Sequence, residues 1–155
     1  MKFSNWINWS NRNSLVGIKF PGIYCIAVKE SDISNDCFQL IPELEYIGMT
    51  NSKGGLKSRL NQFNNTVKGK LQHGGADRFM KKYYNEPEEK LVKKMFVSVW
   101  TFDCKVDSNK YDDLLTMGEV AKSEYVCFAE YVNKYGQLPE FNNKKDSHKL
   151  SRNNK

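Results

Sequence analysis

The sequence predicts one α/β domain of the α+β kind, with three main strands and three or four helices. Two observations predict it. Three short runs rich in apolar and β-branched residues lie at 22–30, 37–50 and 94–103. Two other segments, 56–67 and the stretch from residue 108 onward, have apolar residues at helical spacing. No internal repeat or interdomain linker separates these segments, so we expect residues 1–142 to fold together.

The first two strands are predicted to pair. The run 22–30, "GIYCIAVKE", and the run 37–50 are separated by the turn-rich stretch "SDISND". This arrangement is typical of an antiparallel hairpin with a long loop. Pro42 lies inside the second run and cannot donate to a ladder, which indicates an edge strand or a bulge there.

The helices are predicted from apolar spacing. Leu56, Leu60, Phe63 and Val67 form one stripe on a helix over 56–67, and a short basic helix over 76–85 should stop near Pro87. A long helix follows residue 108, and Gly136 is its C-cap candidate. We expect the long helix to face the sheet with one stripe, formed by Ala121, Tyr125, Phe128, Val132 and Tyr135.

The charge distribution favours a polyanionic partner. The chain has 155 residues and a net charge of +6, and residues 53–94 hold eleven Lys/Arg against four Asp/Glu, a local +7. Such a block of positive charge is typical of nucleic-acid binding. No apolar run is long enough to cross a membrane. The four cysteines are far apart, which favours reduced thiols in a cytoplasmic protein. The polar, basic tail 143–155 is predicted to be disordered.

Three motifs carry a family resemblance. Gly22-Ile23-Tyr24, then Tyr46-Ile47-Gly48, then the segment 55–60 with Arg59 thirteen residues after Tyr46 resemble the GIY-YIG endonuclease superfamily. The resemblance implies a small three-stranded antiparallel sheet flanked by helices. It also implies a metal-dependent DNA endonuclease, and the short chain favours a stand-alone, restriction-like or repair-like enzyme.

The resemblance assigns roles to three residues. Tyr24 is implied as the general base, Tyr46 as its assistant or as the group that positions the nucleophile, and Arg59 as the clamp on the phosphate. An unperturbed tyrosine has a pKa of about 10, so its phenolate is scarce at neutral pH. Nearby cations must therefore lower that pKa, or the phenol must relay its proton elsewhere.

The implied metal is Mg²⁺ or Mn²⁺, held by one glutamate of the long helix. Glu130 has the family's separation from Asn142, whereas Glu124 lies on the shoulder of the predicted stripe, from which a side chain can reach the sheet edge. We favour Glu124 and keep Glu130 as the alternative; Glu119 is a weaker candidate on the exposed face. Asn142, or its neighbour Asn143, is expected to help hold the site together.

One position departs from the family. Many members have a histidine four residues after the helix arginine, and this chain has Phe63 there. His73, in "LQHGG", is expected to supply an imidazole from the next loop instead. His148 lies in the tail and is a poor candidate.

The expected partner is duplex DNA, bound by a monomer or a homodimer. Cations can hold phosphates without reading sequence. The predicted phosphate contacts are Lys57, Lys68, Lys70, Arg78, Lys81 and Lys82. Two other functions remain open: a nucleic-acid-binding module that has lost catalysis, and a basic scaffold protein.

Overall fold

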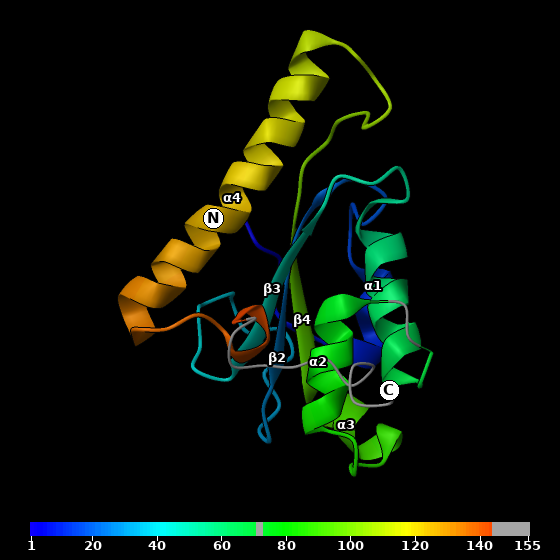
Figure 1. The fold of residues 1–155 in the computed structure, drawn as a ribbon, viewed down its shortest axis with the longest axis vertical. Helices are drawn as coiled ribbons and strands as arrows, with labels where there is room; N and C mark the ends of the chain where they lie inside the picture. Colours follow the sequence, from blue (N-terminus) through cyan, green and yellow to red (C-terminus); the bar gives the residue numbers. More distant parts are fainter. Residues whose placement is uncertain (71–72, 144–155) are drawn as a thin grey trace, which may run out of the picture.

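A four-stranded antiparallel sheet forms the centre of the fold (Figure 1). The computed structural model describes residues 1–70 and 73–143. Its strands lie in the order β1-β4-β2-β3, with bounds β1 Ile7–Asn8, β2 Gly22–Val28, β3 Leu44–Thr50 and β4 Met95–Thr101. The predicted α+β class and the three main strands are confirmed. The second strand was predicted too long, because residues 37–43 precede β3 without joining it.

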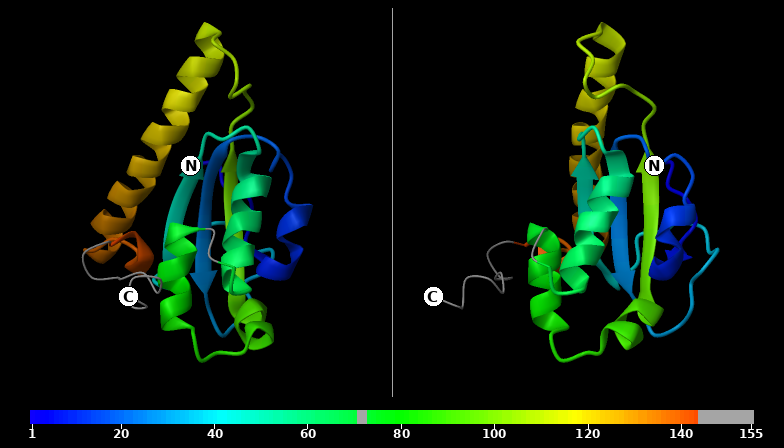
Figure 2. Two further views of the ribbon diagram at one scale, coloured as in Figure 1. Left: turned by 45° about the vertical axis from the view of Figure 1, so that its right-hand side comes forward. Right: turned by 90° about the vertical axis from the view of Figure 1, so that its right-hand side faces the viewer.

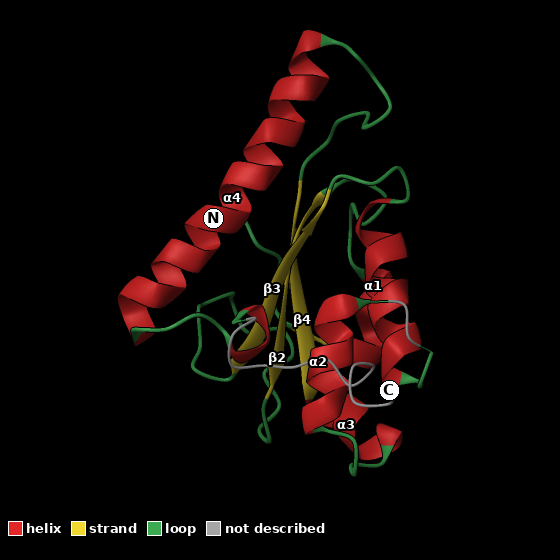
Figure 3. Cartoon of the chain, viewed as in Figure 1, coloured by secondary structure: helices red, strands yellow, loops and turns green. Residues whose placement is uncertain are grey.

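Helices account for most of the remaining ordered structure (Figure 3). The α-helices are α1 Gly55–Val67, α2 Gly74–Lys82, α3 Glu88–Lys94 and α4 Tyr111–Tyr135, and two short 3-10 helices are η1 Trp9–Ser14 and η2 Glu140–Asn142. Helix α3, which follows Pro87, was not predicted. As predicted, Gly136 ends α4 with a left-handed backbone, at φ 75°.

The sheet separates two apolar clusters. Because side chains alternate along a strand, β2 directs Tyr24 and Ile26 to the face covered by α1, α2 and α3, and Ile23 and Cys25 to the opposite face. Helix α4 covers that opposite face with only part of its length, and its first turns extend past the sheet (Figure 2). Among the described residues, no helix combines the length and apolar character that a membrane span requires.

The N-terminal segment forms the edge opposite β3. Two-residue strand β1 pairs with β4, and the flanking Trp6 and Trp9 are buried in the two different clusters. The sequence did not predict this strand, since its two residues carry no periodicity.

A bulge in β3 decides which of its side chains reach the tyrosine face. Tyr46 pairs with Ile26, but the next pair along is Leu44 with Ala27, which leaves Glu45 as the extra residue. Consequently Leu44 and Ile47 both point to the α4 side, while Tyr46 points to the α1 and α2 side. Strand β3 is also the free edge of the sheet, in agreement with the edge or bulge that Pro42 indicated.

The predicted apolar stripe of α4 is wrong for three of its five residues: Phe128 and Tyr135 pack against the core, but Ala121, Tyr125 and Val132 are exposed. The side that packs on the sheet is formed by Val120, Ser123, Cys127 and Tyr131. Tyr125, at the centre of the predicted stripe, is instead 72% exposed. The helix therefore has two apolar sides, and the sequence pattern selected the outer one. Apart from Asn143, the tail predicted to be disordered lies outside the described residues.

Candidate active site

Tyr24 and Tyr46 are neighbours on one face of the sheet. Tyr24 pairs across the ladder with Gly48, and Tyr46 pairs with Ile26, so the two tyrosines are diagonal to each other on β2 and β3. Their ring centroids are 5.8 Å apart. Diagonal neighbours on the same face of a sheet lie within reach of aromatic side chains. The two motif triplets therefore meet at one place.

Two glycines leave room for the tyrosine rings. A Cβ on Gly48 would lie 2.5 Å from the Tyr24 hydroxyl and 2.7 Å from the ring of Tyr46. A Cβ on Gly75, in the first turn of α2, would lie 2.5 Å from Cζ of Tyr46. Any side chain at either position would have to displace a ring. Gly48 of the second triplet and Gly75 of the "HGG" sequence are thus glycines for the same reason: the tyrosine rings occupy the space that a side chain would need.

His73 caps helix α2 and contacts Tyr24 at the same time. Its Nδ1 accepts hydrogen bonds from the backbone N–H groups of Gly75, at 3.0 Å, and Ala76, at 3.2 Å. Its Nε2 lies 2.7 Å from Oη of Tyr24. A neutral imidazole carries a single N–H. Because Nδ1 accepts, the proton is on Nε2, and His73 donates to Tyr24.

Burial keeps this imidazole neutral. His73 is 3% exposed, and its pKa is lowered to about 3, mainly by burial and secondly by the charge of Arg59. A group with so low a pKa cannot take up a proton near neutral pH. His73 is therefore a fixed hydrogen-bond donor in this site, and the proton-accepting role has to lie elsewhere.

The hydroxyl of Tyr24 is directed to Tyr46. Tyr24 is fully buried, whereas Tyr46 lines an open pocket. With its oxygen accepting from His73, Tyr24 donates its own proton in the hydrogen bond between the two hydroxyls. Burial raises the pKa of both tyrosines; on Tyr46 the hydrogen bond from Tyr24 and the charge of Arg59 act in the opposite direction. Tyr46 is thus the better placed of the two to accept a proton from a bound molecule.

Arg59 reaches the tyrosines from α1. It lowers the pKa of Tyr24 through its charge and a side-chain hydrogen bond, and its Nη1 donates to Oε1 of Gln62 at 3.1 Å. Its Nε is buried and has no partner among the described residues. A buried donor without an acceptor is costly. Guanidinium and phosphate match in shape and charge, so the Arg59 side chain is of a suitable kind for a phosphate, although its Nε is closed to solvent.

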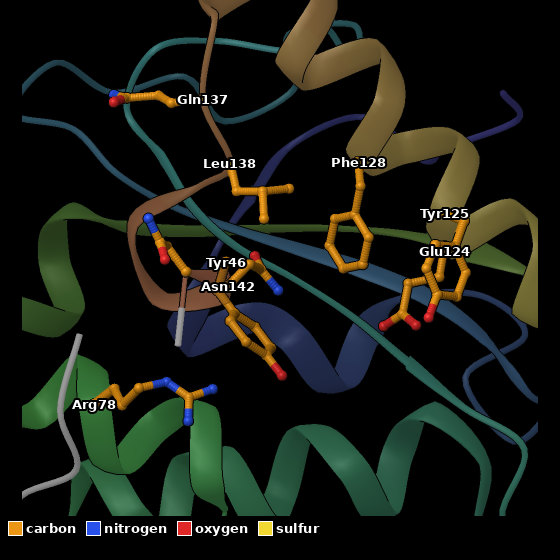
Figure 4. Close-up of a pocket in the computed structure, with 9 residues that line it drawn as sticks. Tyr46, Arg78, Glu124, Tyr125, Phe128, Gln137, Leu138 and Asn142 are labelled. Carbon is orange, nitrogen blue, oxygen red and sulfur yellow. The ribbon is translucent and has the colours of Figure 1, made fainter. Parts of the chain in front are cut away.

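A pocket of about 690 Å³ opens beside Tyr46. Figure 4 shows the Tyr46 hydroxyl, the Glu124 carboxylate and the Arg78 guanidinium converging on it from β3, α4 and α2. Arg78 is buried, and its Nε donates to the Phe141 carbonyl at 3.0 Å, which fixes the guanidinium at the wall. The negative charge of Glu124 raises the pKa of Tyr46, and Arg59 and Arg78 lower it. The Tyr46 hydroxyl therefore interacts with one negative group and with two positive groups.

The structure separates the two glutamate candidates. Glu124 is half-buried in the pocket wall, and Glu130 is exposed and does not line the pocket. Glu119 is also exposed and forms an ion pair with Lys122. The sequence favoured Glu124 because of its angular position beside the predicted apolar stripe of α4, and that stripe is not the side that packs on the sheet. Glu124 still reaches the pocket, because it also lies on the shoulder of the side that α4 does bury.

Asn142 fastens η2 to the edge strand. Its Oδ1 accepts from the Ile47 N–H at 2.8 Å, and its Nδ2 donates to the Ile47 carbonyl at 2.7 Å. This pair of bonds satisfies both backbone groups of the residue next to Tyr46 on the open edge of the sheet. Asn142 lines the pocket, but its amide is occupied. Asn142 is therefore a positioning residue. Of the two asparagines considered from the sequence, Asn142 is the one that makes these contacts with β3.

The predicted phosphate contacts divide into three groups: one pocket residue, two ion-paired lysines and three lysines without an ion pair among the described residues. Arg78 belongs to the pocket, Lys82 is paired with Glu45 at 3.0 Å and Glu140 at 2.7 Å, and Lys68 is 4.0 Å from Glu88. Within residues 1–70 and 73–143, the remaining predicted cations form no ion pair: Lys57, Lys70 and Lys81. Lys82 fastens α2 to β3 and η2, so it is less available to DNA than the sequence suggested.

The pocket fits a divalent cation that is shared with a substrate. In the described part of the chain, no three His, Cys, Asp or Glu residues cluster as a metal site would require. Glu124 offers one carboxylate beside open space. Mg²⁺ is commonly bound by one or two carboxylates together with substrate phosphates and waters. The donor set therefore suits Mg²⁺ or Mn²⁺ bound jointly with a phosphate.

Sequence reasoning missed part of the pocket. Tyr125 was assigned to the core and Arg78 to an outer surface, and both line the pocket. The sequence did contain a signal for Arg78, because this residue lies on the short helix α2, whose N-cap is His73. Comparisons with family models, with curated proteins and with solved structures found no match to this chain.

Asn142→Ala should destabilise the fold through the sheet edge. The substitution leaves the Ile47 N–H and carbonyl without partners, at a cost of about 1–3 kcal/mol in free energy of unfolding. Denaturant titration measures it, with Asn143→Ala as the matched control. An equal loss in both variants would mean that the two bonds to Ile47 have no special weight.

The low pKa of His73 should appear in the pH dependence of stability. The folded pKa, about 3, lies below the ordinary value of 6.5, so the folded state binds fewer protons and stability falls as the pH drops below 6.5. From pH 7 to pH 5, wild type should lose about 2 kcal/mol that His73→Gln does not lose. Urea titrations of both proteins at the two pH values measure the difference. Parallel losses would show that the imidazole titrates freely.

Proposed function

We propose that this protein is a metal-dependent endonuclease that hydrolyses phosphodiester bonds in duplex DNA, with a GIY-YIG-like fold and site. The proposal rests on where the side chains of the motifs lie in the structure. Tyr46 and Glu124 line one pocket, and the buried Tyr24–His73 pair and Arg59 act on Tyr46 from behind the pocket wall, so side chains from five separate segments gather around one hydroxyl. The fold alone would not require polar groups of these kinds to converge.

Tyr46 is the proton acceptor in this proposal; it acts as the phenolate, after its own proton has left to solvent through the pocket, and the charges of Arg59 and Arg78 favour that ionised form. A water that attacks phosphorus must lose a proton, and a general base has to contact the pocket to receive it. Tyr46 does so, and Tyr24 is completely covered. The hydrogen bonds run from the α2 backbone to His73, from His73 to Tyr24, and from Tyr24 to Tyr46. The last two stabilise negative charge on the oxygen that accepts them, so the roles that the resemblance implied for the two tyrosines are exchanged.

Arg59 and Arg78 hold the phosphate. Both guanidinium groups act on Tyr46 electrostatically, so a phosphate that bound them would lie next to its hydroxyl. Two fixed cations also stabilise the charge that develops on phosphate oxygens during hydrolysis. Glu124, on the opposite wall, is the metal ligand. A divalent cation there supplies Lewis-acid activation of the phosphate and charge compensation for the leaving oxygen.

A nucleic-acid-binding module without catalysis is the second candidate. Two observations favour it: burial raises the pKa of both tyrosines, and Phe63 stands where many GIY-YIG enzymes have a histidine. In the structure Phe63 packs against His73, with ring centroids 5.1 Å apart. The histidine that contacts Tyr24 is thus delivered from α2, which favours the enzyme.

Glu124→Gln should abolish cleavage and leave DNA binding in place. The amide keeps the shape of the side chain but loses the charge that holds the cation. Glu130→Gln is the matched control, on the same helix and exposed. The measurement is single-turnover cleavage of plasmid DNA across a titration of Mg²⁺ and of Mn²⁺.

Three outcomes distinguish the candidates. Cleavage by wild type and Glu130→Gln but not by Glu124→Gln supports the enzyme and its metal ligand. Cleavage lost in Glu130→Gln alone would assign the ligand to Glu130. Binding by wild type with no cleavage at any metal concentration would establish the binding module and refute the enzyme.

DNA affinity should fall steeply with salt, through the cations that lack an ion pair. Replacing Lys57 and Lys81 together by alanine should reduce the slope of log K against log[salt] by about 2, because each phosphate contact contributes about 1. Lys53→Ala with Lys122→Ala is the control, since these two lysines form surface ion pairs. Fluorescence anisotropy with a labelled duplex measures the slopes. Equal slopes in the two double variants would place the DNA on another surface.

A further inference from the structure

The outer side of helix α4 is an apolar surface. Nine large apolar side chains of the described residues are exposed, and six of them are on α4: Tyr111, Leu114, Leu115, Tyr125, Val126 and Val132. Tyr111 and Tyr125 are 75% and 72% exposed. Contiguous apolar surface of this kind marks an interaction site, whereas apolar residues scattered singly do not.

The spacing on this side is that of a helix-pairing surface. Apolar or small residues recur after three and four positions at Tyr111, Leu114, Gly118, Ala121, Tyr125 and Phe128. We refer to these six residues as the α4 seam. Alternating steps of three and four give the 3.5-residue period of helices that pack along their length. The side of α4 that packs on the sheet is formed mainly by Val120, Ser123, Cys127 and Tyr131, and of the seam residues Phe128 also packs partly against that core.

Gly118 has no explanation within one copy of the chain. It lies in the interior of α4, where glycine is the poorest helix former after proline. Its backbone does not need a positive φ, and a Cβ built on it meets nothing within 4 Å. An alanine would therefore fit without a clash and would strengthen the helix. A glycine at this position is suited to the close approach of another backbone.

The α4 seam is complementary to the α4 seam of a second copy that runs antiparallel to it. Read in either direction from its centre, it has small residues, Gly118 and Ala121, flanked by large ones, Leu114 and Tyr125. In an antiparallel pair of copies, small residues would oppose small residues and large would oppose large. A two-fold interface requires such self-complementarity. The exposed side chains of the seam offer on the order of 400 Å² per copy, about half of the roughly 800 Å² per partner of a standard interface, so the expected dimer is one of micromolar affinity.

We propose that the protein forms a two-fold symmetric dimer in which the α4 seams of two copies pack antiparallel. Gly118 of one copy then lies opposite Ala121 of the other, and Leu114 lies opposite Tyr125. The same register brings Tyr111 of the second copy against Phe128, which lines the candidate active site. Each copy thus adds an aromatic side chain to the rim of the other's pocket.

The dimer would give the proposed function a two-fold arrangement, and this consequence rests on that function. The two strands of a DNA duplex run in opposite directions and are related by two-fold axes. A dimer with one pocket per copy can present one pocket to each strand. The assembly itself stands on the α4 seam and can be tested without DNA.

Sedimentation velocity from about 1 to 200 μM tests the assembly. Wild type should shift from about 18 kDa to twice that mass. Leu114→Asp with Tyr125→Asp should raise the dissociation constant at least about 100-fold, because each carboxylate would be buried against an apolar surface. Val16→Asp is the control, since Val16 is 91% exposed and lies outside α4. A monomeric wild type at 200 μM, or equal weakening by the control, would overturn the proposal.

Gly118→Leu distinguishes specific packing of the α4 seam from non-specific association through exposed apolar residues. In a monomer the leucine fits and favours the helix, so the thermal midpoint measured at low concentration should stay the same or rise. In the dimer it holds the two backbones apart, so the dissociation constant should rise at least about tenfold. Unchanged dimerisation in this variant would place the interface elsewhere. None of these results depends on cleavage, so the dimer and the proposed nuclease can fail separately.

Discussion

The two hydrogen bonds from the first turn of α2 to Nδ1 of His73 are the constraint on which the site depends. They leave Nε2 as the only place for the imidazole proton, and this fixes the direction of every hydrogen bond that follows. His73 must donate to Tyr24, and Tyr24 must donate to Tyr46. Backbone geometry at a helix start thereby decides which of two adjacent tyrosines can accept a proton. Gly75 serves the same arrangement twice, because it supplies one N–H and leaves room for the Tyr46 ring.

The open edge of the sheet is secured from the C-terminal side of the chain. Asn142 pairs with both backbone groups of Ile47, and Arg78 binds the carbonyl of Phe141 from α2. Lys82 adds ion pairs to Glu45 and Glu140. These bonds connect β3, α2 and η2 around the pocket, so its walls are held by polar contacts. A free strand edge invites pairing with other chains, and here the edge beside the site is already partly occupied.

The fold and the site were predictable to different extents. Local patterns located β2, β4, α1 and α4, because burial on a sheet or a helix imposes a period on the sequence. The pairing of His73 with Tyr24 joins residues 49 positions apart, and no local period encodes such a contact; only the resemblance and the "HGG" sequence pointed to it. Strand β1 also escaped prediction, since a two-residue strand has no repeat to detect, and Pro42 indicated an edge or a bulge without locating the extra residue at Glu45.

The error in α4 has a physical cause that also explains the surface of the helix. Seen in sequence, Ala121, Tyr125, Phe128 and Val132 form a more regular apolar stripe than the side that packs on the sheet, which includes Ser123 and Cys127. The sheet accepts the weaker side, because the first turns of α4 extend beyond it and because Tyr131 there donates to backbone carbonyls of residues 42 and 44. Ala121, Tyr125 and Val132 of the stronger stripe are left facing outward, and Phe128 is half-buried. A pattern that is regular enough to predict burial, yet exposed in one copy of the chain, is what an interface between two copies would produce.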